Sequence, residues 1–361
     1  MNSLVIVGRY PFPGRRLEGM VQRIANIDGR LQDIPRTYLD LYGFKHLKSS
    51  RENIANVEVY TASFLHMFDI FLILRSARTV YVHSIYFYAL ILFPLLLVGK
   101  KTKVILDIHG TVPEELQHSG KTVLSKIMKI VERVAFSRIK LAVCVTRRMC
   151  RLYSERYPIS DAKFLYLPIF TSQVCCRANF DEVEELRLKL GVPISAKVYL
   201  YSGGLHTWQN IDLMLKVSKS LYSSGDNWFL FLTGETEELN RKIGQVFGEA
   251  ASRIIVTHVK PEDLRNYYEL ADYGFILRED HILNKVANPT KMIEYLYFGM
   301  RPIVLSSDIG DFSELGYEYV DVNTVNFLAE NNEKSEINRN ISLRLFADVE
   351  TVNLPEHIQC Q

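Results

Sequence analysis

The stretch ADYGFILREDHILNKVANPTKMIEYLYFGMRPIV, residues 271–304, contains the order of elements that decides the fold. Its apolar run at 273–277 predicts a β-strand, which a polar loop separates from a helix over 289–298. Gly299 is expected to end this helix, because glycine readily adopts the left-handed conformation found at helix C-termini. A second strand follows at 302–305. This alternation of strand and helix favours a parallel α/β sheet.

The start of the predicted helix, Asn288-Pro289-Thr290-Lys291, suits an anion. Asn is a preferred N-cap residue, and Pro suits the first helical position. Lys291 lies in the first turn, where the helix dipole disfavours a cation. Glu294 follows on the same side of the helix, about one turn deeper. Since the free N–H groups of a helix start bind phosphate, this local conflict indicates a functional site that includes Asn288 and Thr290.

Length and composition indicate a two-domain protein of a reducing compartment. At 361 residues the chain exceeds the usual size of one compact domain. Hydrophobic content of 48% and charged content of 23% are ordinary for a folded soluble protein. The five cysteines form no CxxC pair, and the N-terminal apolar run fits a first strand rather than a signal peptide. We therefore expect a cytoplasmic protein.

Charge is distributed unevenly along the chain. Residues 1–185 contain 26 Lys and Arg against 17 Asp and Glu, a net +9, whereas residues 186–361 contain 17 against 24, a net −7. Nine basic residues and a single acid, Glu132, lie within Lys121–Arg151, part of which has helical amphipathic spacing. A solvated helix face would explain this pattern, and so would contact with an anionic membrane surface.

A second apolar stretch, IYFYALILFPLLLV at 85–98, is too short to cross a bilayer. A spanning helix needs about 20 residues, and Pro94 interrupts this run. We interpret it mainly as a buried helix, with shallow membrane insertion as the alternative, and we predict no transmembrane helix.

Short apolar strands alternate with helical segments in both halves. The expected strands cover 4–7, 57–60, 79–83, 103–108, 141–145, 198–202, 228–233, 253–259, 273–277 and 302–305. The expected helices of the second half cover 211–221, 237–247, 261–270 and 289–298. This order predicts an α/β protein of two Rossmann-like parallel-sheet domains that face each other across a ligand-binding cleft.

Changes in composition suggest the domain boundaries. We place the first domain at 1–180, the second at 181–340, and a C-terminal tail at 341–361 that packs back on the first domain. The linker is expected within 168–193, where a strand gives way to an acidic helix. The polar segment 330–340 is expected to be an exposed connection.

The loop after the first strand contains Gly8, Gly14 and Gly19 ahead of a helix. Glycines allow close approach of a backbone to a ligand, and Arg15 and Arg16 are suited to meet an anion. A simple turn explains the same glycines equally well.

A polar pair, Asp107 and His109, stands at the end of the strand VILDI. Polar side chains at the carboxyl end of a buried strand favour a functional role, in which His109 donates a hydrogen bond to a sugar hydroxyl or a developing charge. Helix capping by Asp107 is the alternative.

Two further loops in the second half suit phosphate. Gly203 and Gly204 follow the strand VYLYS, so backbone N–H groups there can approach an anion. In the opening stretch, Arg278, Lys285 and Lys291 are candidate partners of a diphosphate, because cations can offset leaving-group charge without a metal.

These motifs resemble a known family. YSGGLHTWQNID, FLFLTG, PEDLRNYYELADYGFILRE and PTKMIEYLYFGMRPIV look like the nucleotide-sugar domain of GT-B fold glycosyltransferases, closest to the retaining family 4 of the bacterial surface-polysaccharide type. LDIHG and AVCVTRRMCRLYSERY resemble the acceptor domain. The resemblance covers most of residues 1–310. It implies transfer of a hexose-type sugar from a nucleotide diphosphate donor to a lipid-linked glycan acceptor.

The resemblance also implies how this enzyme would work and where. The reaction would proceed with retention and without a metal or other cofactor, in capsule or O-antigen biosynthesis. The enzyme would be peripheral at the inner face of the cytoplasmic membrane, and nucleic acid would not be a partner.

The resemblance assigns roles to individual residues. Glu294 matches the carboxylate that accepts both ribose hydroxyl protons, and an ionised carboxylate has the acceptor capacity for this contact. Lys291 and Arg278 match the cationic diphosphate clamp. The remaining matches are His109 beside the transferred sugar and the glycines Gly19, Gly203 and Gly204 beside the phosphates.

The sequence departs from the family pattern at one position. Eight residues before Glu294, where a glutamate normally contacts the sugar, stands Val286. Glu279 or Asn284 is the candidate replacement. The departure keeps open a catalytically inactive, nucleotide-sugar-binding partner subunit. A sugar-nucleotide epimerase of the same fold is a third reading, against which the basic segment Lys121–Arg151 argues.

Overall fold

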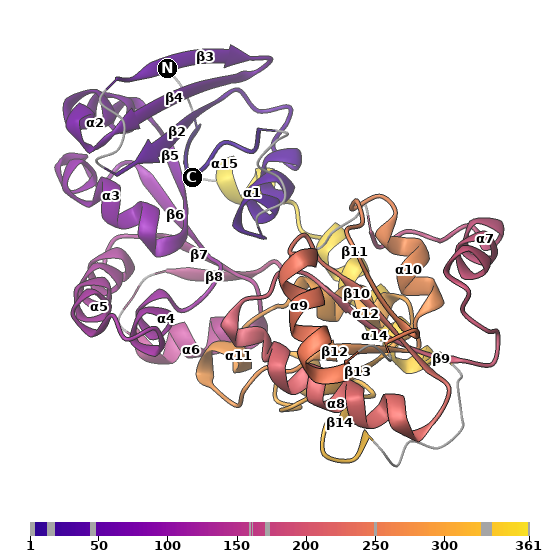
Figure 1. The fold of residues 1–361 in the computed structure, drawn as a ribbon. Helices are drawn as coiled ribbons and strands as arrows, with labels where there is room; N and C mark the ends of the chain where they lie inside the picture. The colour runs from indigo at the N-terminus through magenta and orange to yellow at the C-terminus, as the bar shows by residue number, and fades with distance from the viewer. Residues whose placement is uncertain are drawn as a thin grey trace. The chain divides into compact units, whose positions relative to one another are not determined.

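The chain forms two compact α/β units (Figure 1). The computed structural model describes residues 4–12, 19–43, 48–158, 160, 162–169, 174–248, 251–325 and 334–359. Unit 1 comprises residues 1–169 and 349–361, and unit 2 comprises residues 170–348. Each unit is built on one β-sheet, as the alternation of strands and helices predicts.

Unit 1 contains an eight-stranded sheet of order β3-β4-β2-β1-β5-β6-β7-β8. Its strands are β1 (Leu4–Val7), β2 (Arg36–Tyr42), β3 (Ser50–Ile54), β4 (Val57–Ser63), β5 (Thr79–His83), β6 (Lys103–Ile108), β7 (Leu141–Cys144) and β8 (Lys163–Tyr166). Its helices are α1 (Gly19–Gly29), η2 (Phe64–His66), α2 (Met67–Ser76), α3 (Ser84–Leu97), α4 (Val112–His118), α5 (Thr122–Phe136), α6 (Arg147–Arg156) and α15 (Leu354–Gln359). All pairings are parallel except that of β3 with β4.

The central strands of unit 1 are the ones that the sequence predicts best. β1, β5 and β6 are short apolar runs and lie buried side by side. The prediction misses β2 and β3 for two different reasons. β2 places Asp40 inside a buried strand, where it accepts a hydrogen bond from Arg9 at 3.2 Å. β3 is an exposed edge strand of polar sequence, SRENI, so it has no apolar pattern to detect.

The apolar stretch at 85–98 forms helix α3. Its inner side is buried and includes Ile85, Tyr88 and Ile91. Near its C-terminal end, Phe93 and Leu97 are nevertheless exposed. Within the described part of the chain, no helix combines the length and the apolar character that crossing a bilayer requires.

Unit 2 contains a six-stranded parallel sheet of order β11-β10-β9-β12-β13-β14. Its strands are β9 (Lys197–Ser202), β10 (Asn227–Leu232), β11 (Ile254–Thr257), β12 (Tyr273–Ile276), β13 (Arg301–Val304) and β14 (Val320–Asp321). Its helices are α7 (Phe180–Leu190), η3 (Thr207–Gln209), α8 (Ile211–Ser224), α9 (Thr236–Phe247), α10 (Leu264–Leu270), α11 (Ile282–Lys285), α12 (Thr290–Tyr297), α13 (Phe312–Leu315) and α14 (Glu336–Glu350).

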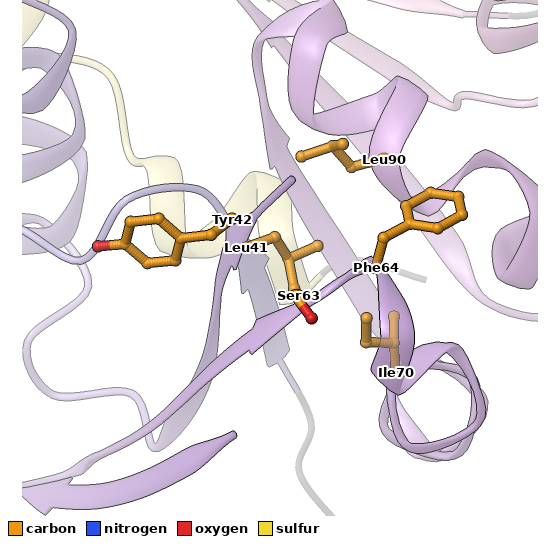
Figure 2. A pocket seen from close by; sticks show the side chains of 6 residues that line it. All are labelled: Leu41, Tyr42, Ser63, Phe64, Ile70 and Leu90. Atoms are coloured by element: carbon orange, nitrogen blue, oxygen red, sulfur yellow. The ribbon is translucent and has the colours of Figure 1, made fainter. Parts of the chain in front are cut away.

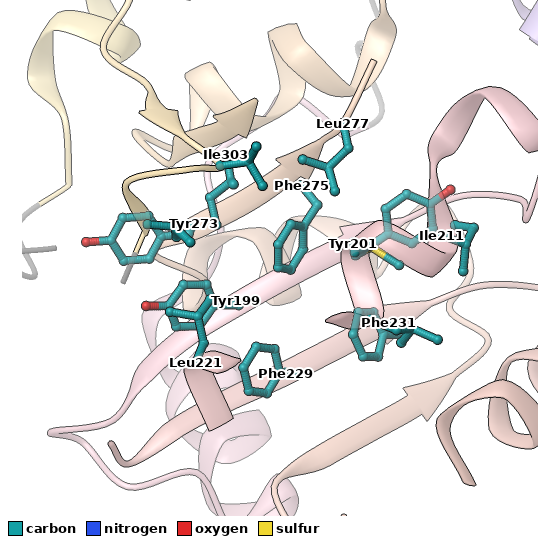
Figure 3. Close-up of a cluster of buried hydrophobic side chains, with 14 of the residues drawn as sticks. Tyr199, Tyr201, Ile211, Leu221, Phe229, Phe231, Tyr273, Phe275, Leu277 and Ile303 are labelled. Atoms are coloured by element: carbon teal, nitrogen blue, oxygen red, sulfur yellow. The ribbon is translucent and has the colours of Figure 1, made fainter. Parts of the chain in front are cut away.

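An aromatic cluster fills one side of this sheet (Figure 3). The ring of Tyr199 stacks on Phe229 and on Tyr273, with centroid distances of 5.3 and 5.0 Å. These residues come from three adjacent strands, so the cluster packs across the order β10-β9-β12. Because the pairings are parallel, the carboxyl ends of these strands lie at one edge.

The opening stretch folds as β12, α12 and β13, with β12 and β13 parallel. Gly299 has φ of +68°. It donates to the carbonyl of Leu296, and Met300 donates to that of Tyr295, the Schellman pattern that closes a helix. At the other end the prediction is wrong by one residue. The N-cap is Pro289, not Asn288, because the backbone becomes helical only at Thr290.

The segment 330–340 is not the exposed connection that its polarity suggests, as far as its described residues 334–340 show. Asn338 is fully buried and donates to the carbonyl oxygens of Met300 and Glu318, both at 2.9 Å. Residues 330–333 lie outside the described part.

Helix α14 runs through residue 340, and the chain then continues to α15. There Thr79 donates to the carbonyl of Ile358 at 3.1 Å, and Lys103 donates to that of His357 at 2.6 Å.

Candidate functional site

The carboxyl edge of the sheet in unit 2 brings together three of the predicted phosphate elements. Gly203 follows β9, Arg278 follows β12, and Lys291 lies in the first turn of α12. Gly203 has φ of +125°, and a Cβ atom there would lie 2.6 Å from Nζ of Lys291. Only glycine fits this backbone and this close approach. The glycine loop and the lysine therefore form one site, although 88 positions separate them.

Lys291 is a buried cation that forms no ion pair within the described part of the chain, although the charge of Glu294 partly offsets its own. Its Nζ is buried and has no hydrogen-bond partner in the described structure, although the rest of the side chain is partly exposed. The ammonium lies 4.3 Å from the ring centroid of Tyr201, a cation–π contact. Burial, with the charge of Arg278 adding to it, lowers the pKa of Lys291 to about 7. The site is thus short of one negative charge.

Arg278 supplies a second cation beside Lys291. Burial lowers its pKa from the ordinary value. Its Nη1 lies 3.4 Å from Oδ1 of Asn284, whose amide nitrogen in turn donates to the carbonyl of Glu279 at 2.8 Å. Asn284 therefore orients the guanidinium. The carboxylate of Glu279 is on an exposed residue, and Val286 is buried.

Glu294 lies one turn deeper in α12 and is only 7% exposed. Tyr268 donates to its Oε2 at 3.0 Å, and the hydroxyl of Tyr268 also lies 2.6 Å from Oγ of Ser202, the last residue of β9. Burial and the charge of Glu294 raise the pKa of Tyr268, so this phenol stays protonated and remains a donor. The carboxylate is thus held in a fixed orientation at the same strand edge.

The other predicted donor-binding residues lie close to this site in the chain. Asn288 and Thr290 are partly exposed and flank the N-cap of α12. Gly204 follows Gly203, and a Cβ on it would lie 3.2 Å from Oε2 of Glu235. Lys285 forms ion pairs with Asp280 at 2.8 Å and Asp308 at 3.4 Å, so its charge is already compensated.

In unit 1, Asp107 is the centre of a buried polar cluster. Arg23 from α1 donates to both of its carboxylate oxygens, at 3.0 and 3.2 Å. His83 Nδ1 and His109 Nε2 each lie 3.1 Å from Oδ2. Burial alone would raise the pKa of Asp107, but the charge of Arg23 and the contacts of His109 and His83 together outweigh burial and hold that pKa well below its ordinary value. Asp107 does not cap the helix that follows, because the N-cap residue of α4 is Thr111.

His109 is oriented by this cluster. The Asp107 carboxylate can only accept, so the Nε2 of His109 carries the hydrogen between them. Its Nδ1 is buried and has no hydrogen-bond partner among the described residues, and the side chain is 12% exposed. His109 therefore offers an unoccupied hydrogen-bonding nitrogen at the carboxyl edge of the unit 1 sheet.

The ligand atoms of His83, Asp107 and His109 lie within 4.8 Å of one another, which is close enough for a metal ion. Arg23, however, already compensates the charge of Asp107 on both oxygens. A dication would add an uncompensated charge to a buried site beside a guanidinium. These residues fit a hydrogen-bonded network better than a metal site.

Several site residues have no signal in the sequence. Arg23 and Asp107 are 84 positions apart, and Tyr268 and Ser202 are 66 apart, so local spacing could not pair them. His83 could have been found, because it ends a buried strand as Asp107 does. Gly19 is the first residue of α1.

Three residues of the first predicted loop, Gly14, Arg15 and Arg16, lie outside the described residues. A small hollow elsewhere in unit 1, lined by Leu41, Tyr42, Ser63, Phe64, Ile70 and Leu90, contains none of the candidate residues (Figure 2).

Comparison with known proteins identifies the fold. No protein-family model matches the chain, and no curated protein matches it in sequence. Solved structures do match over the whole length. The sucrose-phosphate synthase of Thermosynechococcus elongatus is 11% identical with a TM-score of 0.69, covering 98% of this chain and 97% of that one.

Two further solved structures agree. Anabaena HepE, determined with UDP and glucose, is 12% identical with a TM-score of 0.67 and 98% coverage of both chains. WaaG, a glycosyltransferase involved in lipopolysaccharide biosynthesis, is 10% identical with a TM-score of 0.65, covering 99% of this chain and 100% of that one. The architecture is thus the GT-B fold of two Rossmann-like domains, as the sequence motifs predicted.

Proposed function

We propose that the chain is a glycosyltransferase that moves a hexose-type sugar from a nucleotide diphosphate donor to a lipid-linked glycan acceptor. The observation that carries the proposal is the buried, unpartnered Nζ of Lys291 beside Arg278 and the backbone of Gly203. Two desolvated cations at a helix N-terminus are costly unless an anion binds there. A diphosphate supplies the missing charge and accepts hydrogen bonds from both side chains.

Glu294 supports a nucleoside diphosphate rather than an inorganic anion. Its carboxylate lies one helical turn from Lys291, and Tyr268 donates to its Oε2 at 3.0 Å. A carboxylate has room for several donors, so it can accept both hydroxyl protons of a ribose. Asn288, Thr290, Gly203 and Gly204 would complete the donor site in unit 2, and the family resemblance assigns Gly19 of unit 1 to the phosphates as well. Neighbours with the same fold include one determined with UDP and glucose, which agrees with a nucleotide-sugar donor.

We propose a retaining, metal-independent transfer. The bond between the anomeric carbon and the diphosphate oxygen breaks, and the bond to the acceptor oxygen forms on the same face of the sugar. The acceptor hydroxyl proton passes to the departing diphosphate. Lys291 and Arg278 stabilise the charge that develops on this leaving group, so no bound cation is required. His109 would hold a sugar hydroxyl by its free ring nitrogen.

We propose that the acceptor is lipid-linked, in surface-polysaccharide biosynthesis such as that of O-antigen or capsule. The support is the basic segment Lys121–Arg151, suited to the anionic inner face of the cytoplasmic membrane. The protein would act there as a peripheral enzyme, without a cofactor and without a nucleic-acid partner.

Thermal-shift measurements with UDP, GDP, ADP and TDP test the donor site. A ligand that binds only the folded state raises the melting temperature, and we expect a rise with at least one diphosphate, unchanged by EDTA. Inorganic phosphate and the uncharged nucleoside are the controls. If none of the four stabilises the protein, the assignment of the diphosphate site fails.

An activity measurement separates an enzyme from an inactive partner subunit. The matching nucleotide sugar and lipid-linked acceptors are incubated with the protein, and released nucleoside diphosphate is quantified. Release that depends on both acceptor and Lys291 supports the transferase. Tight donor binding without any release or transfer would favour the partner subunit.

A further inference from the structure

Unit 1 exposes an unusual number of large apolar side chains on three neighbouring helices. Helix α3 packs against both α2 and α5, and Figure 1 shows the three along one edge of the unit. We define the apolar face as the exposed side chains of η2, α2, α3 and the amino-terminal part of α5: Phe64, Leu65, Phe68, Leu72, Phe93, Leu96, Leu97, Val123, Leu124, Ile127 and Ile130. Scattered exposed apolar residues are normal, but this many on helices that pack against one another indicate an interaction surface.

The exposed side chains stand on firmly packed helices. The opposite sides of these helices are buried, through Ile70 and Leu74 in α2 and Ile91 and Leu95 in α3. Ile70 also lines a small hollow with Phe64 of η2 and Leu90 of α3 (Figure 2). In α3 the residues Phe93 and Leu97 are one turn apart and 64% and 59% exposed. The apolar face is therefore a fixed feature of the fold.

Helix α5 has an apolar stripe that the core does not use. Val123, Ile127 and Ile130 recur at helical spacing and are exposed, whereas Met128 and Val131 form the separate stripe that faces the core. The apolar side of this helix is thus wider than its packing inside unit 1 requires.

A basic stripe borders the apolar one. Lys126, Lys129 and Arg133 are exposed and recur at i, i+3 and i+7 on the same helix. The one acid of α5, Glu132, is buried and accepts hydrogen bonds from side chains of unit 1, including Tyr157 at 2.6 Å. Lys100 and Lys101, just after α3, are exposed as well. Among the residues of η2, α2, α3 and α5, Asp69 is the one acid that is not buried, so the charge around the apolar face is predominantly positive.

The geometry points to a docking surface for an anionic lipid bilayer, in which the apolar face enters the boundary between headgroups and acyl chains while the basic stripe contacts the headgroups. An apolar side bordered by Lys and Arg is the pattern of helices that lie in a membrane interface. A second copy of the chain would place the same basic stripe against itself at a two-fold interface, which disfavours a dimer. The proposed function uses only the basic segment, whereas this inference assigns membrane insertion to the apolar face. It rests on the proposed function in one respect, since a lipid-linked acceptor is the reason for the protein to approach a membrane.

Flotation with lipid vesicles tests the apolar contribution. The wild-type protein is expected to bind vesicles of phosphatidylcholine with phosphatidylglycerol and to bind pure phosphatidylcholine weakly. The triple variant Phe93→Ser, Leu97→Ser and Ile130→Ser should partition at least roughly 100-fold less, because each buried apolar side chain contributes about one factor of ten. Since all three side chains are exposed, the variant should fold normally.

A matched control comes from unit 2. Phe180, Leu188 and Ile194 are each at least 75% exposed but lie outside the apolar face. Serine at these three positions should leave vesicle binding unchanged. Reversing four charges, at Lys121, Lys126, Lys129 and Arg133, should abolish binding at low salt, with nucleotide binding intact.

A second measurement reports insertion directly. The chain has two tryptophans, Trp208 and Trp228, both in unit 2. A tryptophan introduced by Phe93→Trp should shift its emission to the blue on vesicle binding and be quenched by brominated lipids, relative to the parent protein.

Three results would overturn the inference. The first is normal vesicle binding by the unit 1 triple variant, and the second is an equal loss of vesicle binding in the unit 2 control. The third is a wild-type dimer that the unit 1 triple variant converts to a monomer, because the apolar face would then be a protein interface. Failure of the proposed function is distinguishable, since it would appear as an absent thermal shift with nucleoside diphosphates while vesicle binding persists.

Discussion

Replacement of Lys291 by methionine should stabilise unit 2 while removing donor binding. Methionine is similar in length and fills the same buried space beside Tyr201 without a charge. In the ligand-free protein the ammonium is desolvated and has no hydrogen-bond partner among the described residues, so it opposes folding. The charge of Lys291 becomes favourable only when a diphosphate binds beside it.

The magnitude follows from the pKa of Lys291, which burial lowers from 10.5 to about 7. Between these two values the unfolded chain binds more protons than the folded one, so wild-type stability rises with pH. The cost of the lysine is about 4 kcal/mol at pH 7 and about 2 kcal/mol at pH 9, and it vanishes above pH 10.5. The advantage of Lys291→Met should therefore shrink as the pH rises.

Urea unfolding at pH 7 and pH 9 measures this difference. Tryptophan fluorescence reports on unit 2 specifically, because Trp208 and Trp228 both lie there. Lys285→Met is the control, since Lys285 is paired with Asp280 and Asp308 and should show no comparable stabilisation. A Lys291→Met variant that is no more stable than wild type, or whose advantage does not depend on pH, would refute the reasoning.

Three other variants test the remaining site residues. Glu294→Ala should weaken donor binding at least about 100-fold by calorimetry, because two hydrogen bonds to a charged group are lost; near-normal affinity would contradict the ribose role. Tyr268→Phe removes the hydrogen bond that orients Glu294 and should weaken binding by roughly tenfold; unchanged affinity would mean that Glu294 is positioned by other groups. Asp107→Asn leaves Arg23 buried without its counter-charge and should destabilise unit 1 by about 3–5 kcal/mol. Unfolding followed by circular dichroism should show this destabilisation of unit 1, while the transition followed by tryptophan fluorescence, which reports on unit 2, stays unchanged. An unaltered circular dichroism curve would show that the pair of Asp107 and Arg23 contributes little to stability.

Local sequence was sufficient wherever neighbouring residues fix the structure. The central strands β5 and β6 agree with their predicted bounds, because each is an apolar run long enough to cross the sheet. Gly299 marks the end of α12 correctly, because its left-handed backbone is a local requirement. The prediction fails for β2 and for the segment around Asn338, where remote partners satisfy polar side chains that a sequence pattern assigns to the surface.

Residue types and order alone thus determined the α/β alternation and the glycine and lysine motifs of the candidate site. Only the tertiary structure decided that Lys291 loses its water against Gly203, and that Arg23 neutralises Asp107. It also decided that Phe93 and Leu97 face outward from an apolar helix. The physical reason is common to all three. Desolvation and charge compensation depend on which distant segments pack around a side chain, and the spacing of residues along the chain does not contain that information.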